Sequence, residues 1–410
     1  MATARLVIVV VTYLLIAFPR VPYLRLNRPA AALAGAVAMV TLGRLPFGDA
    51  LAAIDLNVIV FLLGVLVITG YLEAGGFFEW TARHIVARAT SPAALLTAVV
   101  IASGVLSAFF VNDTVCLMLT PLLIAVLRPL ALDTLPFLLA IALSANVGSA
   151  MTPTGNPQNM LIAVASGLTF RQFVAALVLP SLGGLAIVLG VLCVVFRRQL
   201  RAPMARHVAA PESPFDRGLV SRSMLVFAGA LACWLAGLSL PLVAIAAAAV
   251  LLLIARRDPA IAFRLVDWPL LVFFAALFVV MRGARDLPVV ASLTSVAAAG
   301  LHGAPLHDAL VTSGAMTALS NLVSNVPAVI LWLPVVPKLA APHFIWLIMA
   351  MSSTFAGNLT LLGSMANLIV AERAEAKGER LGFVDYLKAG VPVTILTLCW
   401  GIAMLVLTSG

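Results

Sequence analysis

Charged residues are scarce in this sequence. Asp, Glu, Lys and Arg make up 10% of its 410 residues, whereas a soluble globular domain carries roughly 25%. Hydrophobic residues make up 63%, and apolar stretches recur from one end of the chain to the other. This composition excludes a soluble globular protein. It predicts an all-α polytopic membrane protein with the lipid bilayer as its surroundings.

Cysteine and histidine are also rare, with four and five residues. The cysteines form no CxxC pair, and the histidines form no HExxH motif. An intramembrane enzyme would need such a set, or paired carboxylates in a pocket. We assign His302 and His307, beside Asp308, to a loop rather than to a metal site. The sequence therefore predicts a protein that is not an enzyme and has no resident cofactor.

Basic residues exceed acidic ones and give a net charge of +9. Such an excess can indicate nucleic-acid binding. Here Arg and Lys lie between the apolar stretches, as the positive-inside rule predicts for cytoplasmic loops. We therefore expect no nucleic-acid partner.

Ten apolar stretches are candidate crossings of a hydrocarbon layer roughly 30 Å thick. The first resembles a signal peptide, but no small-residue cleavage site follows it, so we expect a membrane span. The ten candidates cover residues 4–18, 30–45, 56–72, 135–165, 173–196, 222–239, 241–256, 268–283, 343–371 and 388–408.

Two further apolar stretches, 91–127 and 309–337, have polar centres. Val111, Asn112, Asp113 and Thr114 form the first centre, and residues 324–327 form the second. A straight helix would place these groups in lipid without partners. If residues 91–127 enter and leave the membrane on the same side, the basic segments around them lie on one side of the membrane together with Arg20, Arg25 and the central loop. We therefore predict two re-entrant hairpins that open from opposite sides, with both termini in the periplasm; ordinary crossings are the alternative.

The order of elements repeats along the chain. Ser107, Asn112 and Pro121 align with Ser320, Asn325 and Pro334 at one constant offset. An odd number of crossings in the first copy would turn the second copy upside down. We predict a first inverted repeat at 1–200, a cytoplasmic basic linker at 201–221 and a second repeat at 222–410. Each has about five transmembrane helices, a hairpin (91–127 or 309–337) and a broken helix (135–165 or 343–371); chance similarity is the alternative.

The predicted broken helices carry the polar residues of the chain. Residues 146–159 hold seven amide or hydroxyl side chains and are interrupted by Pro153 and Pro157. A helix cannot run through two prolines without losing hydrogen bonds, and freed carbonyl groups at membrane depth must find other partners. The second copy keeps fewer polar residues and no proline. We predict unwound segments that line a solute site, and a kink that only packs helices is the alternative.

Hairpin tips and broken helices bring helix ends together. Helix N-termini suit an anion, and unwound carbonyl groups suit a cation. No Lys or Arg lies within either polar centre. A small anion with a coupling ion, H+ or Na+, fits these parts. Asn112 and Asn325 are candidate ligands of a sodium ion. The candidate binding residues are Asn112, Asp113, Thr114, Asn146, Ser149, Thr152, Gly155, Asn156, Asn159, Ser324, Asn325, Thr360, Gly363 and Asn367.

Four segments carry a resemblance to a known family: FVNDTVCLMLTP at 110–121, GNPQN at 155–159, SNVP at 324–327 and GSMAN at 363–367. The chain resembles the ion transporter superfamily, with its divalent-anion/sodium symporters, citrate permeases and arsenite permeases. The resemblance implies that the hairpin tips hold sodium and a substrate carboxylate. It also implies a homodimer in which a transport domain moves against a scaffold. Asn112 and Asn325 match the Ser-Asn-Thr tips of the symporters, whereas Val111, Asp113 and Val326 depart from them.

These features predict a secondary active transporter of a small anion, a carboxylate or an oxyanion, in the inner membrane. Asp113 is expected to carry the coupling ion, a proton rather than sodium, because a carboxylate inside a membrane is costly and functional by default. Its alternative role is to cap a hairpin arm. An arsenite or antimonite efflux permease, a cation/proton antiporter of the same fold and a passive channel stay open as alternatives.

Overall fold

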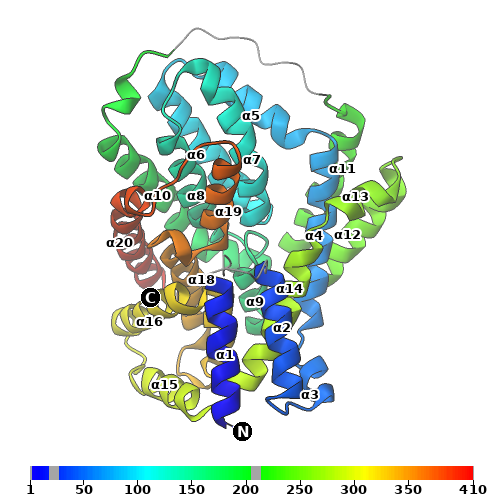
Figure 1. The fold of residues 1–410 in the computed structure, drawn as a ribbon, viewed down its shortest axis with the longest axis vertical. Helices are drawn as coiled ribbons and strands as arrows, with labels where there is room; N and C mark the ends of the chain where they lie inside the picture. The colour runs from blue at the N-terminus through cyan, green and yellow to red at the C-terminus, as the bar shows by residue number, and fades with distance from the viewer. Residues whose placement is uncertain (1, 18–26, 205–213, 410) are drawn as a thin grey trace.

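The computed structural model describes residues 2–17, 27–204 and 214–409. Within them the regular structure is helical, without a strand (Figure 1). The α-helices of the first half are α1 (Ala2–Ala17), α2 (Arg28–Thr41), α3 (Phe47–Ala52), α4 (Leu56–Ala74), α5 (Phe77–Arg88), α6 (Pro92–Phe109), α7 (Asn112–Leu127), α8 (Leu135–Ser149), α9 (Pro157–Ser166) and α10 (Phe170–Val195).

The second half repeats this order. Its α-helices are α11 (Arg217–Leu235), α12 (Leu240–Ile254), α13 (Pro259–Leu265), α14 (Trp268–Arg285), α15 (Pro288–Ala299), α16 (Pro305–Val323), α17 (Asn325–Trp332), α18 (Pro342–Ala356), α19 (Met365–Ala376) and α20 (Phe383–Thr408). Most corresponding helices have similar lengths, with 19 and 18 residues in α4 and α14 and 26 in both α10 and α20. The exception is α17, which has 8 residues where α7 has 16. The opposite orientation of the two halves in a membrane stays a prediction.

The all-α polytopic fold is confirmed. Seven helices among the described residues are long and apolar enough to cross a membrane: α4, α6, α7 with the turn that follows it, α10, α11, α14 and α20. Many helices begin with a proline at the first or second position, as Pro92, Pro157 and Pro342 do. Proline fits there because its missing N–H has no intrahelical partner in any case.

Four short helices, α3, α5, α13 and α15, were not expected between the predicted spans. The linker predicted at 201–221 overlaps the start of α11, which begins at Arg217. Asp216 starts this helix early: its carboxylate accepts the backbone N–H of Leu219 at 3.0 Å. The Arg257 guanidinium, 2.6 Å from the same carboxylate, holds the pKa of Asp216 below its usual range. Arg20, Arg25 and linker residues 205–213 lie outside the described residues.

Packing divides the helices into two groups. In one group α4 packs on α11, α12 and α13, and α14 packs on α1, α2 and α3. In the other group α6 packs on α8, α16 packs on α18, and α10 packs on α20. Figure 1 places α11 to α13 at one edge of the molecule and α10 with α20 at the opposite edge. Helices α7, α9, α14 and α19 run between these edges and position the site.

The two hairpin segments each consist of two helices that meet at the predicted centre. Helices α6 and α7 pack on each other and are joined at Phe110 and Val111, while α16 and α17 are joined at Ser324. Close packing behind the first hairpin needs glycine. A Cβ atom on Gly148 of α8 would collide with the backbone of Gly104 in α6. Small residues at such contacts let membrane helices approach closely.

The first hairpin gives a test of topology. In a variant that lacks the four native cysteines, single cysteines placed at Arg88 and at Arg128 are expected to react with a membrane-impermeant maleimide from the same side. The reason is that α6 and α7 form an antiparallel pair, so the chain returns to the face from which it entered. Labelling from opposite faces would mean that the segment crosses once and that the count of inverted crossings is wrong.

Candidate functional site

Two interruptions of the helices form the frame of the site. Helix α8 ends at Ser149 and α9 begins at Pro157, while α18 ends at Ala356 and α19 begins at Met365. The chain between them is unwound apart from one 3-10 turn, Leu361–Gly363. Asn156 starts α9 by accepting the backbone N–H of Asn159 at 2.9 Å. The predicted breaks in 135–165 and 343–371 therefore lie at equivalent places in the two halves.

Asn159 and Asn367 satisfy the carbonyl groups that the breaks release. The amide nitrogen of Asn159 lies 3.2–3.3 Å from the carbonyl oxygens of Ser149, Ala150 and Thr152. The amide nitrogen of Asn367 donates to the carbonyls of Gly357 and Thr360 at 2.7 and 3.2 Å. Both side chains are fully buried. These asparagines hold the unwound segments in shape, since a carbonyl group away from water needs a partner.

Each hairpin tip docks on the break of its own half. The backbone N–H of Asn112 donates to the carbonyl of Gly155 at 2.9 Å. Asn325, with its amide nitrogen turned toward two carbonyl groups, donates to Ser353 at 3.0 Å and Gly363 at 3.3 Å. Both glycines are required by packing, because a Cβ on Gly155 would collide with the carbonyl of Ser149 and one on Gly363 would lie 2.6 Å from Asn321 Oδ1.

Hydroxyl groups strengthen this docking. In the first half the carbonyl of Ala108 accepts hydrogen bonds from Thr152 and Thr154. In the second half Thr360 donates to Asn321 Oδ1 at 3.0 Å, and Asn321 donates to the carbonyl of Ala356 at 2.9 Å. The two halves therefore use threonine for the same contact, with a backbone acceptor in one and a side-chain acceptor in the other.

Asn146 in α8 joins the two halves. Its amide nitrogen donates to the side-chain oxygens of Asn358 at 2.8 Å and Asn367 at 3.0 Å. Its oxygen accepts from Asn112 Nδ2 at 3.1 Å and Ser364 Oγ at 2.9 Å. All four hydrogen-bonding positions of this buried amide are used. One side chain thus links the first hairpin tip to the break of the second half.

Thr354 in α18 makes the reciprocal connection. Its hydroxyl oxygen lies 3.4 Å from Asn156 Nδ2 and 3.3 Å from Gln158 Nε2, at the start of α9. Asn156 also donates to Ser149 Oγ at 2.9 Å. The start of α9 is therefore fastened to α18, just as the start of α19 is fastened to α8.

A cavity of about 30 Å³ lies where these parts meet. By this measure a water molecule needs roughly 10–15 Å³, so the closed cavity holds a compact solute at most. Four helices, α7, α9, α17 and α19, begin at its wall. Its lining residues are Asn112, Asp113, Pro157, Gln158, Leu270, Phe273, Phe274, Ser324, Asn325, Val326, Ser364 and Met365.

The electrostatics of the cavity follow from these helix starts. Each N-terminus presents the positive end of a helix dipole, although the backbone N–H groups of Asn112, Asp113 and Asn159 already have acceptors. Among the described residues, no side chain caps α7, α17 or α19. Asp113, 7% exposed, is the one charged residue in the described lining. The cavity therefore combines four positive helix ends with a single carboxylate.

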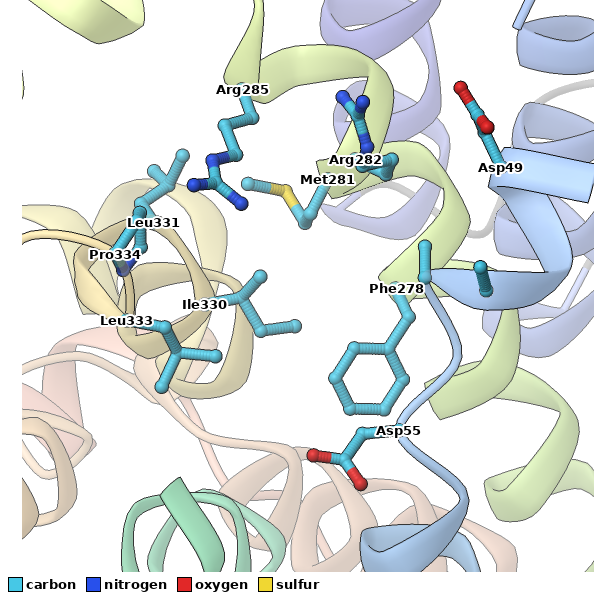
Figure 2. A pocket seen from close by; sticks show the side chains of 12 residues that line it. Asp49, Asp55, Phe278, Met281, Arg282, Arg285, Ile330, Leu331, Leu333 and Pro334 are labelled. Atoms are coloured by element: carbon cyan, nitrogen blue, oxygen red, sulfur yellow. The ribbon is translucent and has the colours of Figure 1, made fainter. Parts of the chain in front are cut away.

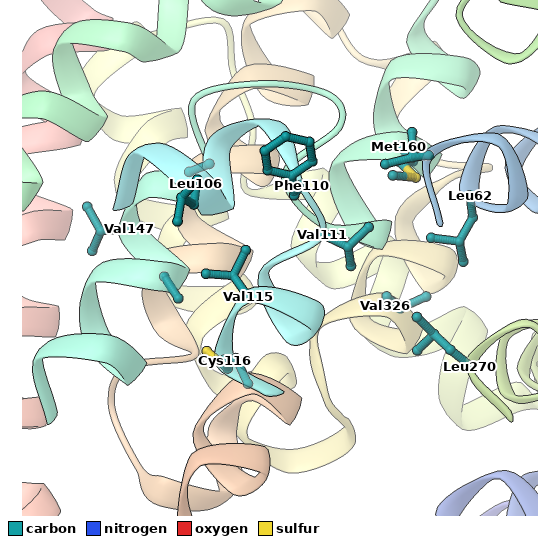
Figure 3. Close-up of a cluster of buried hydrophobic side chains, with 14 of the residues drawn as sticks. Leu62, Leu106, Phe110, Val111, Val115, Cys116, Val147, Met160, Leu270 and Val326 are labelled. Atoms are coloured by element: carbon teal, nitrogen blue, oxygen red, sulfur yellow. The ribbon is translucent and has the colours of Figure 1, made fainter. Parts of the chain in front are cut away.

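Apolar side chains seal the first tip. Val111 and Val115 are fully buried and belong to the large hydrophobic core, which also contains Phe110 and Val326 (Figure 3). Phe273 and Phe274 of α14 form the opposite wall of the cavity. Water is thereby kept from the polar groups, which strengthens electrostatic interactions inside.

Arg28 is the functional candidate that the sequence did not indicate. It opens α2, is 8% exposed and lies near enough to Asp113 for the two charges to interact. The absence of Lys and Arg from both polar centres in the sequence is therefore misleading. A basic residue far away in the chain lies close enough to interact with Asp113 although it does not line the cavity, and only its position before an apolar stretch could have signalled it.

The predicted site residues fall into two sets. Asn112, Asp113, Ser324 and Asn325 line the cavity. The others, apart from Thr114, support the lining through hydrogen bonds or close packing: Asn146, Ser149, Thr152, Gly155, Asn156, Asn159, Thr360, Gly363 and Asn367. Thr114 is not part of the lining. Gln158, Ser364 and the aromatic wall of α14 line the cavity but were not among the predicted site residues.

A larger cleft lies elsewhere. It encloses about 520 Å³ between the end of α14, the end of α17 and the segment around α3. Figure 2 shows Arg282 and Arg285 with Asp49 and Asp55 around it. Acidic and basic groups are balanced here, and no helix break opens into it. We therefore place the functional site at the small central cavity rather than at this larger cleft.

Three comparisons agree with this architecture. Residues 13–356 match the citrate transporter family. The chain is 32% identical to the silicon efflux transporter LSI3 of Oryza sativa subsp. japonica, with 96% of each chain covered. It is 31% identical to the inner membrane protein YbiR of Escherichia coli, with 79% of this chain and 81% of that one covered.

The fold has a solved counterpart in the YdaH transporter of Alcanivorax borkumensis. The TM-score is 0.59 at 15% sequence identity, with 98% of this chain and 96% of that one covered. This chain therefore belongs to the citrate transporter family and is a multi-pass membrane transport protein, not an enzyme.

Proposed function

We propose that this chain is a secondary active transporter that moves a small anion, a carboxylate or an oxyanion, in exchange for or together with a proton or sodium ion. The observation that carries the proposal is the central cavity at which α7, α9, α17 and α19 begin. Two hairpin tips and two broken helices meet at one point, as in carriers whose site lies at a repeat interface.

The four helix N-termini supply the attraction for an anion. Their N–H groups can replace part of the hydration of an oxygen-rich solute without a fixed cation in the lining. The carboxylate of Asp113 repels an anion as long as the carboxylate is charged. A proton or a sodium ion bound at Asp113 removes this repulsion, so binding of the anion and of the coupling ion favour each other. Sodium at Asn112 and Asn325 is the alternative coupling arrangement.

An efflux permease for a small oxyacid is the second candidate. It is supported by the size of the closed cavity, about 30 Å³, and by the similarity to a protein named as a silicon efflux transporter. A compact oxyacid needs less opening of the cavity than a di- or tricarboxylate. Its net charge is also lower, and the amide and hydroxyl groups of the lining suit it. Arsenite and antimonite belong to the same class of solute.

We also propose the membrane in which the chain is located and its oligomeric state. We expect the chain in an inner membrane, as the name of the YbiR relative suggests. We also expect a homodimer, in which the group of helices around α4 and α14 forms the static part. The helices that carry the tips and breaks would then move against it.

Uptake into proteoliposomes tests the site. Asn112→Ala and Asn325→Ala are each expected to lower the initial rate of substrate uptake at least tenfold, because each removes an amide from a hairpin tip. Candidate carboxylates, oxyanions and oxyacids are screened with a proton or a sodium gradient imposed in turn. Saturation and counterflow distinguish a carrier from a channel.

Asn57→Ala is the matched control, since Asn57 is exposed at the start of α4. Reconstituted protein is quantified for every variant, so a loss of uptake is not confused with a loss of insertion. Wild-type rates in both tip variants would contradict the proposed site, whichever solute is transported.

A further inference from the structure

A second, larger cavity borders the central one. It encloses about 460 Å³ between α1, the start of α2, α14 and the second hairpin tip. This size is within the range of roughly 300–1,000 Å³ that is typical of small-molecule sites. Phe273, Ser324 and Met365 line both cavities. The side cavity is therefore separated from the central cavity by shared side chains.

Among the described residues that line the side cavity, Arg28 is the one charged group. Within the described part of the chain, this guanidinium forms no direct ion pair, although its charge interacts at longer range with Glu372 and Asp113. Its hydrogen-bond acceptor is the thioether sulfur of Met365 at 2.6 Å. A thioether is a weak acceptor. A guanidinium that is 92% buried carries a large desolvation cost, which an anionic partner would offset. Arg28 is thus poised to bind an anion inside the cavity.

The remaining walls are mainly apolar and reach the outer surface of the protein. They are built mainly from aliphatic side chains of α1, α16 and the second break. Val10, Leu14, Leu322 and Leu362 line the cavity and are also exposed large hydrophobic residues. The cavity is therefore continuous with a hydrophobic outer face, which lies in the bilayer in a protein of this class.

We propose that the side cavity binds a single-chain anionic amphiphile, a carboxylate with an aliphatic tail, drawn from the bilayer. The carboxylate pairs with Arg28, and the tail lies between α1 and α16. A small hydrophilic anion is a poor match, because aliphatic walls cannot replace its hydration. A neutral lipid is a poor match as well, because it leaves Arg28 without an anion in direct contact. This ligand is distinct from the transported solute.

The position of the side cavity brings a bound ligand into contact with the second hairpin tip. Asn321 and Ser324 of the second tip line it, and Asn321 also holds Thr360 and Ala356 of the adjacent break. Ser324 adopts φ 76°, a left-handed conformation that is uncommon for a residue other than glycine. An amphiphile in the cavity therefore packs against the strained residue at which the tip turns, and it holds the second hairpin in place.

Binding is tested without any transport assay, in nanodiscs of neutral phosphatidylcholine. Dodecanoate is expected to raise the melting temperature of the wild-type protein in a saturable manner, since a ligand that binds the folded state stabilises it. Dodecanol, which lacks the charge, and acetate, which lacks the tail, are expected to leave it unchanged. Arg28→Gln should weaken dodecanoate binding about tenfold or more, because a charged hydrogen bond is lost.

Two substitutions on α1 distinguish an effect of filling the side cavity from a general destabilisation of the protein. Leu14→Trp fills the cavity and should abolish the shift, whereas Val11→Trp on the exposed outer side of α1, away from the cavity lining, should preserve it. Equal shifts with dodecanol, or no shift with dodecanoate, would overturn the proposal. An Arg28-dependent shift with acetate would also overturn it, because the cavity would then be a small-anion site on the transport route. None of these results bears on the uptake experiment at the two tips.

Discussion

Asp113→Asn is expected to abolish accumulation of the substrate against its gradient while exchange across the membrane continues. Asp113 is the one charged residue in the described lining of the central cavity. Asparagine keeps the size of the side chain and its capacity for hydrogen bonds, but it cannot bind a proton or neutralise a cation. The accumulation ratio in proteoliposomes with an imposed gradient should fall to about one, and counterflow measures the remaining exchange.

Asp308→Asn is the matched control for this substitution. Asp308 is also a buried carboxylate in the first turn of a helix, and it accepts the backbone N–H groups of His302 and Gly303 at 3.0 and 2.8 Å. It is part of neither cavity. Loss of this carboxylate is expected to leave accumulation intact. Accumulation by Asp113→Asn at the wild-type ratio and with an unchanged pH dependence would place the coupling site elsewhere.

The structure shows no capping hydrogen bond from Asp113 in the described part of the chain, and such capping was the alternative role of this residue. Within the described residues its carboxylate accepts no hydrogen bond, and no side chain caps α7. Its backbone N–H is bound by Asn112 Oδ1 at 3.0 Å. The carboxylate instead interacts at longer range with two charged groups outside the first hairpin, Asp267 and Arg28. A group held by electrostatics rather than by local capping is the kind that a bound ion or proton can switch.

The sequence predicted well those features that depend on local chemistry. Pro153 and Pro157 cannot continue a helix, and the break between Ser149 and Pro157 lies where they predict it. Asn112 and Asn325 are polar residues at the centres of apolar stretches, and both lie at hairpin tips that line the cavity. Such signals can be read from a few neighbouring residues because they reflect backbone hydrogen bonding within one segment.

Features that depend on long-range packing could not be predicted in this way. Arg28 precedes an apolar stretch and looks like any loop residue of the positive-inside pattern, yet its charge interacts with that of Asp113 in the first hairpin. Thr354 sits in an ordinary apolar helix, and only the fold brings its hydroxyl group to Asn156 and Gln158. The sequence also could not predict the roles of Asn159 and Asn367. Their amides could have faced the solute, but they face backbone carbonyl groups instead.

Asn146→Leu is expected to destabilise the protein and to stop transport. The substitution keeps the branched shape and the number of heavy atoms of the side chain but removes two donors and two acceptor contacts at once. Side-chain hydrogen bonds inside membrane proteins average about 0.6 kcal/mol each, while a buried group left without a partner costs roughly 1–3 kcal/mol. We therefore expect a loss of about 2–4 kcal/mol in the free energy of unfolding. Asn57→Leu, at an exposed position, should stay within about 0.5 kcal/mol of wild type.

The double variant Asn146→Leu/Asn358→Leu distinguishes a network from simple loss of packing. In the single variant the side-chain oxygen of Asn358 keeps its place but loses the donor at 2.8 Å. Replacing Asn358 as well removes this orphaned acceptor, although its contact with the carbonyl of Leu143 is lost at the same time. The cost of the double variant in the free energy of unfolding should therefore be less than the sum of the two single costs. Strict additivity would mean that the two amides stabilise the protein independently. In that case Asn146 would not be the link through which the first hairpin tip and the second break hold one another.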